Sequence, residues 1–269
     1  MEVYFTIITF IYGLLLGSFY NVVGYRLPNN LSIVKPGSFC PKCNHELKWY
    51  ELIPVLSFVI QRGKCRKCGC RISLFYPFIE LLTGILFALS YVVFGFSLEF
   101  IISILISSFL VIIIVSDFSY LIIPDEVTLF ISILSIVVIF IMGGWSLALT
   151  SIIFGLILFA FVYLIMFLGS KIMKEEVLGG GDVKLMFFVG MALNVIDPID
   201  ISSLSSLIVL FNGFFEIFLS SCLAAPFALV SYFSKKKRII PFGPFILTAL
   251  LMIFLMSFSF PKIVFLNIL

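Results

Sequence analysis

Long apolar runs, separated by short polar segments, dominate the chain. Many approach or exceed the roughly 20 residues that a helix needs to cross the hydrocarbon core of a bilayer. The strict alternation of apolar and polar residues expected of a membrane barrel strand is absent, so helices must satisfy the backbone hydrogen bonds. The pattern predicts eight transmembrane helices, near residues 3–23, 74–95, 98–116, 127–143, 146–169, 184–196, 205–233 and 245–266. The segments GGW at 143–145 and NVIDPID at 194–200 are expected to be turns.

The composition agrees with a membrane protein. Of the 269 residues, 62% are hydrophobic and 12% are charged. A soluble domain of this size would carry about twice that charged fraction. The first apolar stretch lacks the basic n-region of a cleaved signal peptide, so we expect a retained span. The predicted fold class is an all-α polytopic membrane protein.

One sizeable polar segment, residues 24–73, interrupts the apolar pattern. It predicts three parts: a first span at 1–23, a small cytoplasmic domain at 24–73 and a membrane-embedded domain at 74–269. With eight spans, 16 of the 17 Lys and Arg residues fall on one face of the membrane. The positive-inside rule makes that face cytoplasmic and puts both termini outside the plasma membrane. The basic excess therefore reports topology, and no nucleic-acid partner is expected.

Two cysteine pairs lie in the polar segment, Cys40-x2-Cys43 and Cys65-x2-Cys68, with 21 residues between them. This spacing is one residue beyond the usual range of a zinc ribbon. Two such knuckles bring four thiolates together around one tetrahedral ion. The reducing cytoplasm disfavours structural disulfides. We therefore predict one structural Zn²⁺ in a zinc-ribbon-like domain, with reduced, metal-free cysteines as the alternative.

Three further residues bear on this site. Cys70 could replace Cys68 as the fourth ligand, whereas His45, the only histidine, is not needed when four thiols are present. Cys222 is expected to be a small buried core residue in the seventh span.

Two acidic residues are expected at the same membrane boundary. Asp117 follows an unbroken apolar run, and Asp182 closes the segment LGGGD, 65 residues further along. Two nearby carboxyls in a low-dielectric setting cannot both ionise, so such a pair shares a proton. The ionised member can then act as general base on a water while the protonated one polarises a carbonyl. The pair predicts a two-carboxylate hydrolytic site.

Other readings of these acids remain open. Asp182 could cap the helix of the sixth span, and Asp117 could mark a membrane edge. Asp125 is expected to be the N-cap of the fourth span. The glycines at 179–181 would let backbone approach the acidic pair closely.

Five motifs in order carry a family resemblance: GSFYNVVGYRLP (17–28), the cysteine segment 40–84, SDFSYLIIPDEVTL (116–129), LGGGDVKLM (178–186) and IPFGPF (240–245). On them the chain resembles the type IV prepilin leader peptidases, membrane aspartic proteases of the GxGD class. The resemblance implies that Asp117 and Asp182 are catalytic and that Gly179 and Gly181 complete GxGD. Two neighbouring residues, Asp125 and Lys184, are expected to support the active site. Tyr20 and Cys70 depart slightly from the family pattern.

The resemblance also implies an activity. Family members remove the leader from prepilins or pseudopilins at the cytoplasmic membrane face. Many also methylate the new N-terminal amine with S-adenosylmethionine, and the four-cysteine domain is typical of those bifunctional members. We therefore expect a bifunctional enzyme with prepilin substrates, bound Zn²⁺ and S-adenosylmethionine as methyl donor.

The methyl-transfer site is less defined by the residues themselves. No glycine-rich nucleotide fingerprint occurs. Glu80, on the second span, could receive the substrate amine or could pair with a loop arginine such as Arg26 or Arg71. A rival function is a membrane transporter or channel with a regulatory zinc ribbon. That reading would place carboxylates near the bilayer midplane on discontinuous helices.

Overall fold

The computed structural model describes residues 1–174, 178–196, 205–233 and 240–259. Eight α-helices and two short 3-10 helices make up the regular structure of this part of the chain. They are α1 (Glu2–Arg26), η1 (Leu27–Asn29), η2 (Trp49–Glu51), α2 (Leu56–Ile60), α3 (Phe75–Phe94), α4 (Leu98–Tyr120), α5 (Asp125–Met173), α6 (Gly180–Ile196), α7 (Ser205–Phe233) and α8 (Gly243–Ser259). The only β pairing in the described ranges is two isolated bridges. The predicted all-α class is confirmed.

Five of these helices, α1, α3, α4, α5 and α7, are long and apolar enough to cross a membrane. The helices α6 and α8 are apolar but only 17 residues long. Helix covers most of every predicted span wherever the chain is described. The count of eight stays a prediction, because length and composition support five crossings. Part of the expected last span, 260–266, and most of the NVIDPID turn lie outside the described residues.

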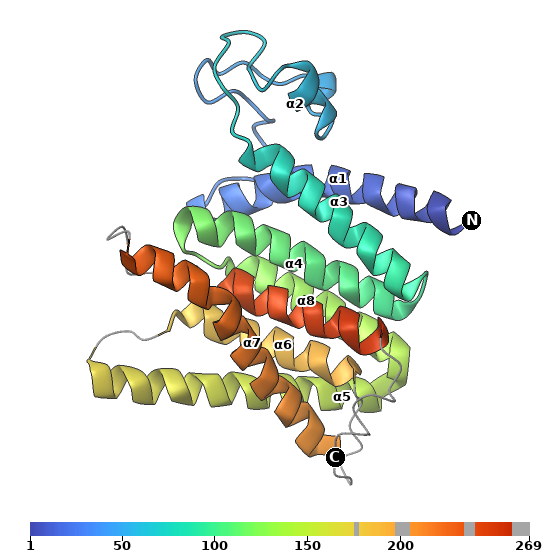
Figure 1. Ribbon diagram of the computed structural model, residues 1–269, viewed down its shortest axis with the longest axis vertical. Helices are drawn as coiled ribbons and strands as arrows, with labels where there is room; N and C mark the ends of the chain where they lie inside the picture. The colour runs from blue at the N-terminus through green and yellow to red at the C-terminus, as the bar shows by residue number, and fades with distance from the viewer. Residues whose placement is uncertain (175–177, 197–204, 234–239, 260–269) are drawn as a thin grey trace.

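Two predicted spans, 127–143 and 146–169, are joined in α5 by a sharp kink. Gly143 (φ −138°, ψ 17°) and Gly144 (φ 67°, ψ −159°) leave the helical conformation there. The dihedral angles of Gly144 are essentially accessible only to glycine, because a Cβ would clash with the backbone. The predicted turn at GGW is confirmed, and the two halves of α5 run in opposite directions (Figure 1).

Small residues let the helices pack closely. A Cβ on Gly13 would lie 2.7 Å from the Cα of Gly84, so α1 and α3 are nearly in backbone contact. Gly155 and Gly190 bring α5 and α6 together in the same way. Close backbone approach through small residues is a common basis for helix association in membranes.

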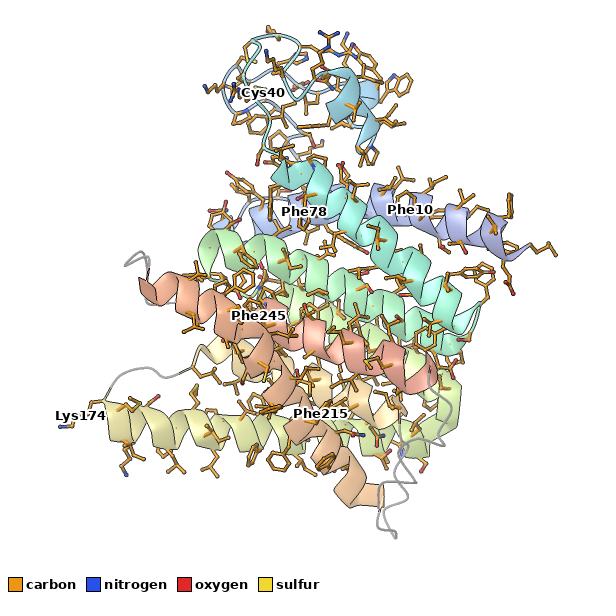
Figure 2. All side chains as sticks on the ribbon, in the orientation of Figure 1. Phe10, Cys40, Phe78, Lys174, Phe215 and Phe245 are labelled. Atoms are coloured by element: carbon orange, nitrogen blue, oxygen red, sulfur yellow. The ribbon has the colours of Figure 1, made fainter. Side chains whose placement is uncertain are left out.

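The helix α4 lies in the middle of the bundle, with α1 and α3 on one side and α6, α8 and α5 on the other (Figure 1). Phe109 of α4 and Phe188 of α6 are fully buried, with ring centroids 5.1 Å apart. Aromatic side chains also project outward, among them Phe78 and Phe215 (Figure 2). Lipid tails can cover such side chains, so the outer surface is consistent with a membrane protein.

Cys222 differs from expectation. It is exposed on the outside of α7, and its expected burial in a protein core is wrong. An apolar run cannot distinguish a core-facing position from a lipid-facing one, because both surroundings are apolar.

The cysteine segment between α1 and α3 forms a small unit on the flank of the bundle, marked by Cys40 in Figure 2. Its two β-bridges pair Phe39 with Glu46 and Lys64 with Arg71. The proposed division of the chain at residues 23 and 73 stays a prediction.

Candidate active site and cysteine cluster

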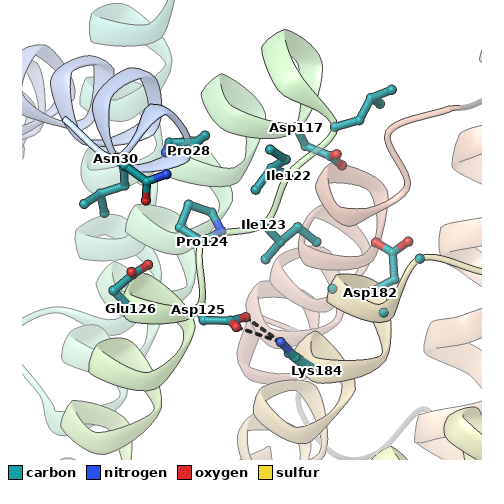
Figure 3. A pocket seen from close by; sticks show the side chains of 15 residues that line it. Pro28, Asn30, Asp117, Ile122, Ile123, Pro124, Asp125, Glu126, Asp182 and Lys184 are labelled. Atoms are coloured by element: carbon teal, nitrogen blue, oxygen red, sulfur yellow. Dashed lines mark hydrogen bonds and ion pairs between the residues drawn. The ribbon is translucent and has the colours of Figure 1, made fainter.

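A cavity of about 440 Å³ lies where the ends of several helices meet (Figure 3). Its walls come from the segment after α1, the end of α4, the α4–α5 connection and the start of α6. The residues that line it are Leu27, Pro28, Asn30, Asp117, Leu121, Ile122, Ile123, Pro124, Asp125, Glu126, Gly179, Gly180, Gly181, Asp182 and Lys184. The cavity therefore collects residues of three of the five motifs, GSFYNVVGYRLP, SDFSYLIIPDEVTL and LGGGDVKLM, which are distant from one another along the chain.

Asp117 lies on the last turn of α4 and is 5% exposed. Its Oδ2 atom is buried and has no hydrogen-bond partner in the described part of the chain. The helix ends at Leu121, which adopts a left-handed conformation (φ 56°) and donates its N–H to the Asp117 carbonyl. After this reversal Ile122 and Ile123 line the same cavity as the Asp117 side chain (Figure 3).

Asp182 lies on the first turn of α6, and the preceding glycines determine how closely that turn approaches its surroundings. A Cβ on Gly181 would lie 3.0 Å from the Ile123 side chain, and one on Gly179 would lie 3.1 Å from Asp182 Oδ2. A Cβ on Gly180 would meet nothing within 4 Å. The two glycines of GxGD are thus the two that a larger residue would crowd.

Asp117 and Asp182 line the same cavity although 65 residues separate them. Figure 3 shows the Asp117 side chain at the end of α4 and the Asp182 side chain at the start of α6. Such a pair in a partly buried site can share a proton, as hydrolysis by two carboxyls requires. Whether these residues are catalytic stays a prediction.

Gly243, at the start of α8, was not singled out as a site residue in the sequence. A Cβ there would lie 3.2 Å from Asp117 Oδ2 and 3.0 Å from the Ile113 and Ile123 side chains. The absence of a side chain lets α8 begin directly against Asp117. The Gly-Pro pair in IPFGPF was the available signal, but it does not say which residue the glycine faces.

Asp125 forms an ion pair instead of a helix cap. The N-cap of α5 is Pro124 and Asp125 is its first residue, so the expected N-cap role is wrong. Lys184 Nζ donates to both carboxylate oxygens of Asp125, at 2.7 and 2.8 Å. A carboxylate is still favourable at this helix start because of the helix dipole. The pair joins the start of α5 to the start of α6 at the edge of the cavity.

The cysteine unit brings four thiols together. The Sγ atoms of Cys40, Cys43, Cys65 and Cys68 all lie within 4.8 Å of one another, and this group could hold a metal ion. The separations include 3.8 Å for Cys40 to Cys68 and 4.0 Å for Cys43 to Cys65. A tetrahedral site with Zn–S bonds of about 2.3 Å requires sulfurs about 3.8 Å apart. The geometry fits one zinc ion.

The two knuckles repeat the same backbone hydrogen bonds, 25 residues apart. Cys40 N–H donates to His45 and Cys65 N–H to Cys70, at 2.9 and 2.8 Å. The amides of Asn44 and Gly69 each donate at 2.9 Å to the carbonyl of the first cysteine of their knuckle. Both residues have positive φ, 54° and 70°. Cys70 therefore occupies the position of His45 in the other knuckle, an equivalence that sequence reasoning missed.

Distance distinguishes Cys68 from Cys70. The group whose Sγ atoms all lie within 4.8 Å of one another contains Cys68 and not Cys70. Cys70 Sγ lies 3.5 Å from Cys40 Sγ, as a fifth, neighbouring thiol. The pKa shifts do not separate the two kinds of thiol, because neighbouring thiols raise the pKa of Cys43 to about 11 and that of Cys70 to about 12. The geometry therefore favours Cys68 as the fourth ligand.

Two other predicted residues have structural partners. His45 Nε2 lies 3.2 Å from Glu51 Oε2, away from any ligand role. Glu80, 8% exposed, accepts a 2.7 Å hydrogen bond from the Val55 backbone amide. Arg26 instead donates to the carbonyls of Ser32, Pro36 and Gly37. The predicted alternative that Glu80 pairs with Arg26 is therefore wrong. No ion pair joins Glu80 to Arg71 among the described residues either.

Comparison with known proteins covers most of the chain. Residues 11–94 match the bacterial peptidase A24 N-terminal domain, and residues 104–229 match the type IV leader peptidase family. A prepilin leader peptidase/N-methyltransferase of Bacillus subtilis (strain 168) is 35% identical over 88% of each chain. One of Myxococcus xanthus (strain DK1622) is 38% identical over 70% of this chain and 56% of its own. No solved structure matches the chain.

Proposed function

Since the chain belongs to the type IV leader peptidase family, we propose that it removes the leader peptide from type IV prepilins or pseudopilins and methylates the new N-terminus. The observation that carries the proteolytic half is the position of Asp117 and Asp182 on one cavity. The proposed enzyme is an aspartic endopeptidase of the GxGD type with a second, methyltransferase activity.

Hydrolysis in this proposal uses the two carboxyls in opposite protonation states. The ionised one removes a proton from a water whose oxygen bonds to the scissile carbonyl carbon, while the protonated one donates to the carbonyl oxygen. The tetrahedral intermediate then breaks its C–N bond. The carboxyl that took the water proton passes it to the departing amine, and the other carboxylate takes back a proton from a hydroxyl of the intermediate, which becomes the new carboxyl group. Neither residue needs a metal ion for these steps.

The walls of the cavity suit a peptide entering from a membrane edge. Its apolar part includes Leu27, Ile122 and Ile123, while Asn30, Glu126 and the Asp125–Lys184 pair supply polar groups that water can reach. We place this edge at the cytoplasmic face of the plasma membrane, with both termini outside. The support is the positive-inside distribution of basic residues.

The cysteine unit is proposed to hold one structural Zn²⁺ through Cys40, Cys43, Cys65 and Cys68. The ion would close the two knuckles into one folded unit, because four thiolates repel one another without it. S-adenosylmethionine is the proposed methyl-donating substrate. Glu80 is the candidate acceptor for the substrate amine. Its Oε2 atom already accepts a hydrogen bond from the Val55 backbone amide.

The rival transporter function has less support. It needs carboxylates near the midplane of the membrane, on broken helices. Asp117 and Asp182 instead lie at helix ends around one cavity. Glu216 is fully buried within α7, and its carboxylate oxygens have no hydrogen-bond partner in the described part of the chain, so it forms no paired acidic site there.

One experiment tests both halves of the proposal. The purified full-length protein is incubated with a prepilin, with and without S-adenosylmethionine, and the products are weighed by mass spectrometry. We expect loss of the leader in both reactions and one added CH₂ per mature chain only when the donor is present. An uncleaved prepilin would overturn the peptidase proposal, and a cleaved but never methylated product would overturn the methyltransferase half.

A further inference from the structure

The cysteine unit carries an apolar surface that no described part of the protein covers. It is formed by η2 and α2 and has four large side chains: Trp49 (77% exposed), Leu56 (59%), Val59 (63%) and Ile60 (68%). Leu56, Val59 and Ile60 have the i, i+3, i+4 spacing of one helix face. Phe58, by contrast, packs inward against Gly63. We call these four residues the η2–α2 face.

A hydrogen bond fixes the depth of this face relative to the membrane helices. The Val55 amide, directly before α2, donates to Glu80 Oε2 at 2.7 Å. Glu80 is the sixth residue of α3, one of the candidate membrane spans. At 1.5 Å per residue, Val55 lies level with a point about 8 Å along that helix. Figure 1 shows α2 on the flank of the bundle, set back from the helix ends around the cavity.

The backbone at Val55, directly before α2, is strained, and this strained turn sets the orientation of α2. Val55 has φ 61° and ψ −50°, and Leu56 N–H donates to the Pro54 carbonyl at 2.6 Å. This is a γ-turn of the rare type, and it is especially unfavourable for a β-branched residue. Such strain persists only where surrounding contacts over-determine it. The buried Glu80 carboxyl supplies one such contact.

The charge around the face is strongly positive. Residues 24–73 contain nine Lys or Arg and two Glu, an excess of seven positive charges. Lys48 directly precedes Trp49, and Arg62 and Lys64 follow Ile60. Basic residues beside an exposed apolar face are typical of segments that lie in the interface of a membrane with anionic lipids.

We propose that the η2–α2 face is an in-plane membrane anchor, which inserts its apolar side chains among the headgroups of anionic phospholipids and holds the cysteine unit against the bilayer. Trp49 would lie at the headgroup level, where tryptophan is enriched. This inference rests on the membrane insertion of the bundle and is independent of the proposed catalysis.

A lipid surface fits the face better than a protein partner does. The face is joined, through the Val55–Glu80 bond, to a helix whose outer surface already meets lipid. A peptide partner would not require a surrounding excess of seven positive charges. A covering peptide is therefore treated as an alternative outcome of the test.

The test measures the surroundings of Trp49 in the full-length protein. The chain has two tryptophans, so Trp145→Phe leaves Trp49 as the only one. This variant is placed in nanodiscs of phosphatidylglycerol and phosphatidylcholine, with lipids brominated near the glycerol end or near the methyl end of the acyl chain. Roughly twofold quenching is expected from the shallow bromines, with less from the deep ones, for a ring about 5–10 Å into the interface.

Three outcomes decide the matter. Shallow quenching without any substrate, with Trp49 protected from aqueous acrylamide, supports the anchor. Strong acrylamide quenching and none by bromolipid overturns it. Protection that occurs only after a prepilin is added also overturns it, because the face would then bind the substrate.

A matched pair of variants sharpens the result. Val59→Asp adds a charge on the face and should reduce the quenching by bromolipid at least about twofold, because a carboxylate opposes insertion. Asn44→Asp adds the same charge in a knuckle, outside the face, and should leave the quenching by bromolipid unchanged. Aspartate tolerates the left-handed conformation found at this position. Equal quenching in both variants would contradict the assignment of Val59 to the lipid-facing surface.

Discussion

The cysteine unit and the carboxylate cavity are built in opposite ways. The cysteine cluster joins residues at most 28 positions apart, and each knuckle is closed by hydrogen bonds within ten residues. The cavity joins Asp117 and Asp182 across 65 residues, with Gly243 of α8 against Asp117. One site is therefore local in sequence, whereas the other exists only when α4, α6 and α8 pack together.

The difference indicates how each site should respond to change. Knuckles of this kind can fold around their metal as one small unit, so damage there should stay within the unit. The cavity depends on helix ends meeting at fixed distances, so small steric changes at its glycines should reach the acidic pair. The following predictions test this contrast, from the largest expected effect to the smallest.

Removal of either acidic side chain should have the largest effect. Asp117→Asn and Asp182→Asn should each lower prepilin cleavage by about 10³-fold, because each variant loses one of the two protonation roles. Cleavage is measured by product mass on protein purified in the folded, membrane-inserted state. Wild-type rates in either variant would remove that carboxyl from the proposed mechanism.

Loss of a cysteine ligand should release the metal and leave the helix bundle folded. Elemental analysis should find about one zinc per chain, and Ser at Cys40, Cys43, Cys65 or Cys68 should release it. The exposed Cys222→Ser is the matched control and should retain the metal. If Cys70→Ser loses zinc and Cys68→Ser keeps it, the fourth ligand has been assigned to the wrong thiol.

Cleavage should depend on the carboxylate cavity and methylation on the cysteine unit, so variants should separate the two activities. The cysteine variants should reduce methylation more than cleavage, and Asp117→Asn should still methylate a pre-cleaved pilin. The reason is that the carboxylate cavity is lined by no residue of either knuckle. Parallel loss of both activities in every cysteine variant would make the unit a shared scaffold and reject this division.

The glycines before Asp182 offer a smaller, steric test. Gly181→Ala places a Cβ 3.0 Å from Ile123 and should lower cleavage by roughly tenfold, since a small displacement of a catalytic group is costly. Gly180→Ala meets nothing within 4 Å and should be nearly neutral. A reversed order of effects would mean that the close approach to Ile123 does not position Asp182.

The ion pair at the edge of the cavity should matter least. Asp125→Asn or Lys184→Gln should lower cleavage by no more than about fivefold, because an exposed pair contributes roughly 0–1 kcal/mol. Both side chains are at least half exposed. A loss as large as that of Asp117→Asn, measured in the same assay, would give Asp125 or Lys184 a direct part in the reaction.

The sequence by itself predicted the helical class, the turn at GGW and the grouping of four cysteines. These features depend on residues close together in the chain, so apolar run length, glycine position and CxxC spacing were sufficient to find them. Family motifs also singled out Asp117 and Asp182 as a candidate pair. Their catalytic roles await the experiments above.

Only the tertiary structure decided which partners these residues meet. Asp125 pairs with Lys184 instead of capping α5, and Glu80 binds the Val55 amide and not Arg26. Cys222 faces outward, and Gly243 lies against Asp117. The physical reason is that an apolar helix presents similar residues to lipid and to its neighbours. Which face turns inward, and which distant group it meets, depends on close packing between helices that short-range patterns do not contain.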